Sequence, residues 1–236
     1  MGIKGVFLDL GWTLFRPAHS DWFINSKMLE FASWETICNI PKEKRDAVFG
    51  KALAYLDAHH LLKTEEEEIA QFTDFYRMIA AGLPELEITR EQAREIAVFK
   101  VLDTSNYLFF EKARKTILEL REKYKIGIIS DTWPSIDRIL QSGEMADLFD
   151  YKTYSCHLGV YKPHEKMYLH ALAQMNLPPE QTVFVDDGEE NLDGAAACGI
   201  RPILIRTREN APDSGRYPHI DSIEQLSALL ESPLFA

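Results

Sequence analysis

Acidic residues stand at the ends of two apolar runs of the sequence, and they are the first candidates for chemistry. Asp9 closes the run 5–9, and Asp186 and Asp187 close the run 182–187. A carboxylate in such a position can attack phosphorus and form an aspartyl-phosphate. Two adjacent acids are costly to place together without a cation, and oxygen ligands suit Mg²⁺. The alternative is an ordinary turn or helix-capping role for these acids.

A serine, an aspartate and a lysine are candidates for binding an anion. Ser130 and Asp131 follow the apolar run 126–129. The Ser130 hydroxyl and nearby backbone N–H groups are suitable donors to a phosphoryl oxygen. Lys162, just before an expected helix, could neutralise both the nucleophile and the transferred group. Taken singly, a helix cap at Ser130 or Asp131 and a solvated Lys162 are also ordinary interpretations.

Four short apolar runs indicate the strands that must position these residues. The runs cover residues 5–9, 126–131, 182–187 and 202–206. They do not alternate with polar residues, which is typical of strands covered on both faces, as in a parallel sheet. Amphipathic helical segments accompany them at residues 111–125, 164–175 and 189–197. This order predicts an α/β fold, a doubly wound and mainly parallel Rossmann-like sheet with its ligands at the carboxyl ends of the strands.

The segment 16–104 differs from the rest because it contains helical patterns and no convincing strand. The expected helices lie near residues 20–38, 42–60, 65–81 and 90–103. Thr64 with Glu67, and Thr89 with Gln92, have the spacing of capping boxes that open the last two. We therefore predict an α/β core domain at 1–15 and 105–236, with an all-helical cap domain inserted at 16–104.

Composition and charge exclude several classes of function. The formal net charge of −11 argues against a nucleic-acid surface, because binding to phosphate backbones needs clustered Lys and Arg. Three scattered cysteines without CxxC spacing favour reduced thiols in the cytosol over a disulfide framework or a zinc site. No signal peptide and no membrane span is evident, so we expect a cytoplasmic protein that does not bind membranes.

The combination of these motifs is more specific than any one of them. An Asp, a Ser, a Lys-Pro and an Asp-Asp follow successive expected strands, with a helical insertion after the first. In this the chain resembles the haloacid dehalogenase (HAD) superfamily, in its helical-cap (subfamily I), phosphatase-like branch. The resemblance implies that Asp9 is the nucleophile and that Ser130, Asp131 and Lys162 bind phosphate. It also implies that Mg²⁺ is held by Asp9, Asp186, Asp187 and the backbone carbonyl of Gly11.

The sequence departs from the phosphatase pattern two residues after Asp9. Phosphatases of the family carry a second Asp there, as general acid and later general base, whereas this chain has Gly11 followed by Trp12. Losing a general acid–base group typically costs about 10²–10⁴-fold in rate. A weak or specialised phosphatase would borrow a proton carrier, for which the candidates are His19, Asp21 and His157.

Two further interpretations stay open. Phosphonoacetaldehyde-cleaving relatives replace the acid with a small residue and use a cap lysine as a Schiff base, for which Lys51, Lys27 and Lys63 are candidates. Alternatively, the chain is a catalytically impaired binding protein. The leading prediction is an Mg²⁺-dependent hydrolase of a small phosphorylated metabolite that works through an aspartyl-phosphate. The sequence leaves the substrate and the oligomeric state open.

Overall fold

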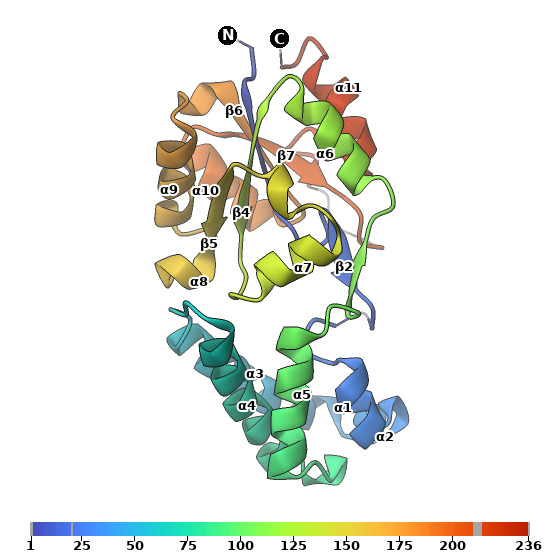
Figure 1. Cartoon of the computed structure of the whole chain (residues 1–236). Coiled ribbons are helices and arrows are strands. Elements are labelled where there is room, and N and C mark those ends of the chain that lie inside the picture. The colour runs from blue at the N-terminus through green and yellow to red at the C-terminus, as the bar shows by residue number, and fades with distance from the viewer. Residues whose placement is uncertain (1, 20, 210–213, 236) are drawn as a thin grey trace. The chain divides into compact units, whose positions relative to one another are not determined.

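The computed structural model describes residues 2–19, 21–209 and 214–235 and divides the chain into two compact units (Figure 1). The first unit comprises Met1–Arg16, Phe109–Thr132 and Leu140–Ala236. The second comprises Pro17–Leu108 and the short segment Trp133–Ile139. The chain therefore passes between the units not only around the helical insertion but also on either side of residues 133–139.

A six-stranded parallel sheet forms the centre of the first unit. Its order is β5-β4-β1-β6-β7-β8, and each neighbouring pair is parallel. The strands are β1 (Gly5–Leu8), β4 (Lys125–Ser130), β5 (Tyr151–Tyr154), β6 (Thr182–Asp186), β7 (Arg201–Ile205) and β8 (His219–Ile220). All four residues of β1 are buried, as its unbroken apolar run predicted. The predicted doubly wound α/β fold is confirmed.

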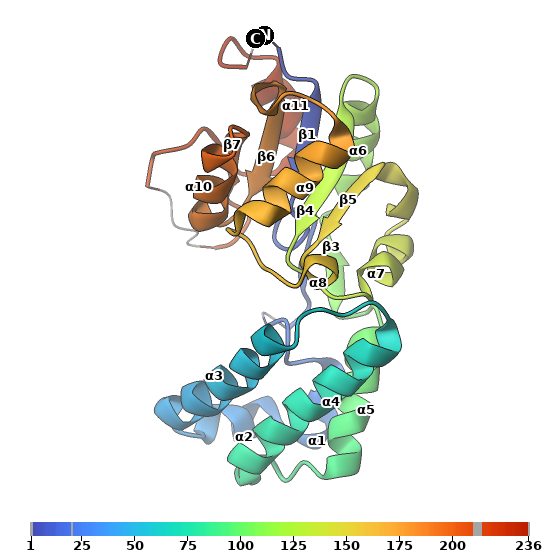
Figure 2. The same cartoon turned by 90° about the vertical axis from the view of Figure 1, so that its left-hand side faces the viewer.

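Helices cover both faces of this sheet. Helices α9 and α10 lie on one face and α6 and α11 on the other (Figures 1 and 2). The helices of this unit are α6 (Ala113–Arg121), α8 (Ser155–Leu158), α9 (Glu165–Met175), α10 (Glu189–Ala197) and α11 (Leu226–Leu230), while α7 (Ile136–Ser142) runs across the boundary at residue 139. The strands β2 (Phe15–Pro17) and β3 (Tyr107–Phe109) form a separate two-stranded sheet where the chain leaves and re-enters this unit.

The second unit is a bundle of helices. Its helices are α1 (Ser26–Phe31), α2 (Trp34–Asn39), α3 (Lys42–Ala58), α4 (Glu65–Gly82) and α5 (Arg90–Leu102). Both predicted capping boxes are present, at Thr64 and at Thr89. The single helix expected at 20–38 is wrong, because Asn25 and Ser33 each cap a separate short helix. Ser20, where that helix was expected to begin, lies outside the described residues.

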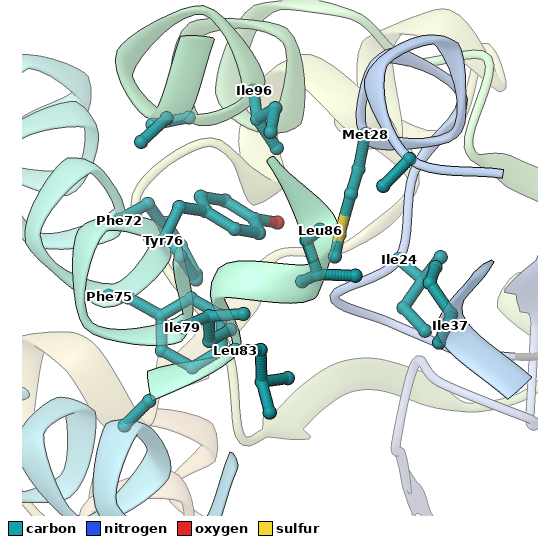
Figure 3. Packing of buried hydrophobic residues seen from close by; sticks show 14 of the residues in the cluster. Ile24, Met28, Ile37, Phe72, Phe75, Tyr76, Ile79, Leu83, Leu86 and Ile96 are labelled. Atoms are coloured by element: carbon teal, nitrogen blue, oxygen red, sulfur yellow. The ribbon is translucent and has the colours of Figure 1, made fainter. Parts of the chain in front are cut away.

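Aromatic and aliphatic side chains fill the interior of the second unit (Figure 3). Phe72, Phe75 and Tyr76 come from α4 and contact one another through their rings. The Tyr76 hydroxyl donates a hydrogen bond to the Phe23 carbonyl at 2.7 Å, which satisfies its polar end. This cluster is separate from the one in the first unit, which is built around Phe7, Phe184 and the helices α9 and α10.

None of the helices in the described ranges is long and apolar enough to cross a membrane.

Candidate active site

Three neighbouring strands place the predicted site residues together. Strand β1 lies between β4 and β6, and Leu8 is in register with Ile128 on one side and Val185 on the other. The Asp9 backbone N–H then donates to the Val185 carbonyl at 2.9 Å. Because parallel strands end at the same edge of a sheet, residues 9, 130–131 and 186–187 share one edge.

Lys162 joins two of the predicted acids. Its Nζ atom lies 2.7 Å from Asp9 Oδ1 and 2.6 Å from Asp186 Oδ2. All three side chains are buried. The ammonium group also lies over the ring of Phe184, 5.3 Å from its centroid. The lysine therefore bridges the residue after β1 and the last residue of β6 in a setting with little water.

Asp131 and a close helix contact hold the Lys162 segment in place. Asp131 Oδ1 accepts a hydrogen bond from the Lys162 backbone N–H at 2.9 Å. On α10, Gly194 lies against Pro163, since a β-carbon at Gly194 would stand 2.8 Å from the Pro163 carbonyl oxygen. The Tyr168 hydroxyl donates to the Asn191 carbonyl at 2.7 Å and ties α9 to α10. Through its hydrogen bond, Asp131 positions the Lys162 backbone.

Asp186 and Asp187 have different surroundings although they are adjacent. Asp186 Oδ1 accepts from the Gly188 N–H at 2.7 Å and from Asn191 Nδ2 at 3.0 Å, in addition to the Lys162 bond on its other oxygen. Its lone pairs are therefore largely used within the protein. Asp187 instead forms an ion pair through Oδ2 with Arg208, from the segment after β7. The sequence carried no motif that pointed to Arg208.

Burial and the closeness of other carboxylates raise the pKa values of acids in this site. Burial, with the nearby Asp186 and Asp187, raises the pKa of Asp9 to about 7 against the opposing effect of Lys162. Burial and the adjacent Asp186 raise the pKa of Asp187 to about 6 although Arg208 opposes them. Burial also raises the pKa of Asp131. Burial alone would lower the pKa of Lys162, but Asp186 and Asp9 raise it well above its ordinary value.

The turn after Asp9 brings no acidic side chain into the site at position 11. Thr13 and Leu14 donate their backbone N–H groups to the Leu10 carbonyl, and Gly11 lies within this turn. Trp12 has a φ of 57°, in the left-handed region that is unusual for a residue with a side chain. The Thr13 hydroxyl is buried without a hydrogen-bond partner among the described residues. The turn is therefore held by its backbone and leaves a polar atom unsatisfied.

The other proton carriers suggested by the sequence have structural contacts of their own. His19 Nε2 shares a hydrogen bond with Ser26 Oγ at 2.8 Å. Asp21 accepts from the backbone N–H groups of Phe23 and Ile24. His157 is exposed on α8, and its ring lies 5.5 Å from that of Tyr154.

The donor set suits Mg²⁺, although it is small. In the described ranges, no three Asp, Glu, His or Cys side chains are grouped to hold a metal ion. Mg²⁺ commonly takes only one or two carboxylates and fills its other positions with water and substrate phosphate. Asp9 and Asp187 are buried carboxylates whose pKa values are raised in spite of Lys162 and Arg208, so a cation beside them would offset the negative charge that these two partners do not balance.

A family model described as haloacid dehalogenase-like hydrolase matches residues 3–199. The chain belongs to the haloacid dehalogenase-like hydrolases. The resemblance inferred from the strand-end motifs is thereby confirmed. Within this hydrolase family, the glyceraldehyde 3-phosphate phosphatase of Pyrococcus furiosus is 33% identical over 116 residues. That alignment covers 46% of this chain and 44% of the relative, so the match spans less than half of the relative's length.

Solved structures of the family share the fold over almost the whole chain. The L-2-haloacid dehalogenase RSc1362 has a TM-score of 0.69 at 17% identity, over 98% of this chain and 100% of that one. The HAD-hydrolase YfnB from Bacillus subtilis, solved with bound magnesium, has a TM-score of 0.64 at 12% identity and the same coverage. At these identities the likeness concerns the fold alone, including the inserted helices.

Proposed function

We propose that the chain is an Mg²⁺-dependent hydrolase that cleaves a small phosphate ester. The observation that carries the proposal is the buried Lys162 bridge between Asp9 and Asp186, with Asp187 beside it. Membership of the hydrolase family and the name of the Pyrococcus furiosus relative support it. The proposed substrate is a phosphorylated metabolite, and the proposed location is the cytosol.

Each residue has a role in this proposal. An Asp9 oxygen attacks phosphorus, the P–O bond to the leaving group breaks, and an aspartyl-phosphate forms. Water then attacks the phosphorus, releasing inorganic phosphate and restoring the carboxylate. Lys162 and Ser130 orient the phosphoryl group, while Asp131 and Asp186 hold Lys162 in place. Mg²⁺ bound by Asp9, Asp187 and the Gly11 carbonyl would offset the negative charge of the phosphoryl oxygens.

The missing acid at position 11 defines what kind of substrate is expected. A leaving group with a low pKa departs without a proton, whereas an alkoxide needs one in the transition state. We therefore expect measurable release of p-nitrophenol from p-nitrophenyl phosphate and slow hydrolysis of alkyl phosphates.

The test measures Mg²⁺-dependent hydrolysis of p-nitrophenyl phosphate and of an alkyl phosphate such as glycerol phosphate. Asp9→Asn should abolish both activities, because the amide oxygen is a poor nucleophile. Gly11→Asp should raise alkyl phosphate hydrolysis by about 10²-fold, with a smaller effect on the aryl ester. Wild-type turnover that survives in Asp9→Asn would overturn the proposed nucleophile.

Gly11 also supports a second candidate, a catalytically impaired protein that binds phosphate without turnover. Binding of inorganic phosphate and Mg²⁺ by wild type, with hydrolysis appearing only in Gly11→Asp, would favour it. The Schiff-base alternative gains no support from the lysines named for it, since Lys51 and Lys63 are exposed and Lys27 pairs with Glu30. Borohydride trapping with phosphonoacetaldehyde would test it directly.

A further inference from the structure

The connection that follows the Ser130 strand is anchored at both of its ends. On the first unit's side, the Thr132 backbone N–H donates to Ser155 Oγ at 2.8 Å, and the Ser155 hydroxyl donates to the Thr132 carbonyl at 3.3 Å. On the second unit's side, Ser135 donates its backbone N–H to Glu68 Oε2 at 2.7 Å and its hydroxyl to Glu68 Oε1 at 2.8 Å. Only Trp133 and Pro134 separate the two anchors.

One face of α4 binds this segment through successive turns. Glu65 pairs with Arg138, with 2.7 Å between Oε2 and the Arg138 Nη2 atom. Gln71 Oε1 accepts a hydrogen bond from Trp133 Nε1 at 2.8 Å. Spacings of three residues place Glu65, Glu68 and Gln71 on the same side of the helix. The segment is therefore held at three successive positions along α4 rather than at one.

The central contact, between Glu68 and Ser135, costs more free energy than apolar packing would if its only role were to hold the segment in place. Glu68 and Ser135 are both buried, and Glu68 has no exposed surface. Desolvating a carboxylate costs several kcal/mol, and apolar groups of similar volume are often as stabilising or more so. Burial raises the pKa of Glu68 to about 7, although Lys100 and the Ser135 donors oppose this shift. A polar anchor gives a fixed geometry, which is what a segment attached to a binding site needs.

We propose that Glu68 is a positioning residue for the phosphate-binding end of β4. It holds Ser135, which is separated from Thr132 by two residues, and thereby restrains the chain that follows Ser130 and Asp131. Asp131 in turn holds the Lys162 backbone, so the same path reaches the lysine of the site. The functional part of this inference rests on the proposed function, because it assumes that Ser130 and Lys162 bind phosphate.

The test compares Glu68→Ala and Glu68→Gln with a matched control, Tyr76→Phe. Tyr76 is also buried on α4 and loses one hydrogen bond in the control, to Phe23, far along the helix from the Ser135 contact. Calorimetry with inorganic phosphate and Mg²⁺ should give about tenfold weaker phosphate binding in Glu68→Ala, the size typical of a lost coupling contact. Glu68→Gln, which retains an acceptor, should recover part of the affinity. Tyr76→Phe should bind phosphate like wild type although its melting temperature falls.

A second readout does not depend on phosphate binding. Hydrogen exchange of the backbone amides of Ser130, Asp131 and Thr132 should be faster in Glu68→Ala and unchanged in Tyr76→Phe. Unchanged exchange at these amides would overturn the proposal and leave Glu68 a stabilising residue only. Faster exchange with wild-type phosphate affinity would also overturn it. If wild type binds no phosphate, the proposed function fails, and the exchange rates alone decide whether Glu68 positions the strand end.

Discussion

Lys162 lies between two carboxylates that arrive on different strands, and each of the three groups depends on the others. A buried charge is tolerable when it has a partner, and removing one partner leaves the other uncompensated. The lysine is therefore a structural element of the sheet edge as well as the proposed phosphate ligand. Substitution of Lys162 should therefore lower the free energy of unfolding, which can be measured without an assay of turnover.

Lys162→Met should lower the free energy of unfolding by about 3–5 kcal/mol in the absence of added metal, because Asp9 and Asp186 lose their shared cation. Urea denaturation followed by circular dichroism measures the change. Lys166→Met is the matched control, since Lys166 is exposed and its ammonium group donates to a backbone carbonyl, that of Leu158, rather than to a buried carboxylate. Equal urea midpoints for the two variants would contradict the prediction.

Arg208 competes with any cation for Asp187. Its guanidinium group pairs with Oδ2 of that residue and is itself partly exposed. Arg208→Ala should therefore tighten Mg²⁺ binding about two- to fivefold, the range expected for a partly exposed ion pair. Titration calorimetry measures the affinity, and Arg206→Ala is the control because Arg206 pairs with Asp221 instead. Weaker Mg²⁺ binding in Arg208→Ala would mean that the arginine supports the site.

At the same scale, the sequence pointed to the residues at strand ends and to Lys162, but it did not connect Arg208 with the site. Asp9, Ser130 and Asp187 could be grouped because parallel strands end at a common edge. The contact of Lys162 with both Asp9 and Asp186 depends on where a loop places a side chain, and residue spacing does not encode that. Arg208 lies beyond β7 without a motif, so nothing in the pattern connected it with Asp187.

Among the elements, the sequence predicted the strands that are unbroken apolar runs and the long helices that begin with a capping box. The apolar runs predicted β1, β4, β6 and β7 to within a residue or two, and the capping boxes fixed the starts of α4 and α5. Strand β5 was missed because it reads Tyr-Lys-Thr-Tyr and lies at the edge of the sheet, where polar residues are tolerated. Likewise, no pattern assigned residues 133–139 to the helical unit, since their partners lie on α4.

Helix α4 carries a titratable contact whose effect on stability has a defined sign. The pKa of Glu68 is about 7 in the folded chain, above its ordinary value of 4.5. The folded state therefore holds the proton more tightly, and this contribution is fully present below pH 4.5 and is lost as the pH rises through 7. His60 acts in the opposite direction, because burial lowers its pKa to about 4.

The expected result is a difference between two pH profiles. The stability of wild type relative to Glu68→Gln should decline between pH 4.5 and pH 7, because only wild type must ionise a buried carboxyl group. Urea unfolding at several pH values measures it, and the His60 contribution cancels since both proteins contain it. A relative stability that rises over this range would contradict the assignment.

At the scale of the whole molecule, each of the two units contains a hydrophobic cluster of its own among the described residues. One is centred on Phe72 and Phe75 of the helical unit and the other on Phe7 and Phe184 of the sheet unit. Units with separate cores commonly unfold in separate steps. The double crossing at residues 133–139 links them without merging these clusters.

Scanning calorimetry should therefore resolve more than one transition. Phe75→Ala should lower the temperature of one transition and Phe184→Ala that of the other. In each case the free energy of unfolding of that unit should fall by about 3–5 kcal/mol, the cost of a large buried cavity. Circular dichroism at each plateau identifies which unit has melted, because one is mainly helical and the other contains the six-stranded sheet. A single transition shifted equally by both variants would contradict the division.

The position of β1 in the sheet has a consequence for the newly made chain. On the ribosome β1 emerges before the other strands of its sheet, yet it lies between β4 and β6, which are translated only after the whole helical segment. At roughly 5–20 residues per second, this apolar strand waits several seconds or more for its neighbours. Until then its backbone N–H and C=O groups lack their partners in the sheet, so we expect the strand that delivers Asp9 to be open to chaperone binding while the helical segment is made.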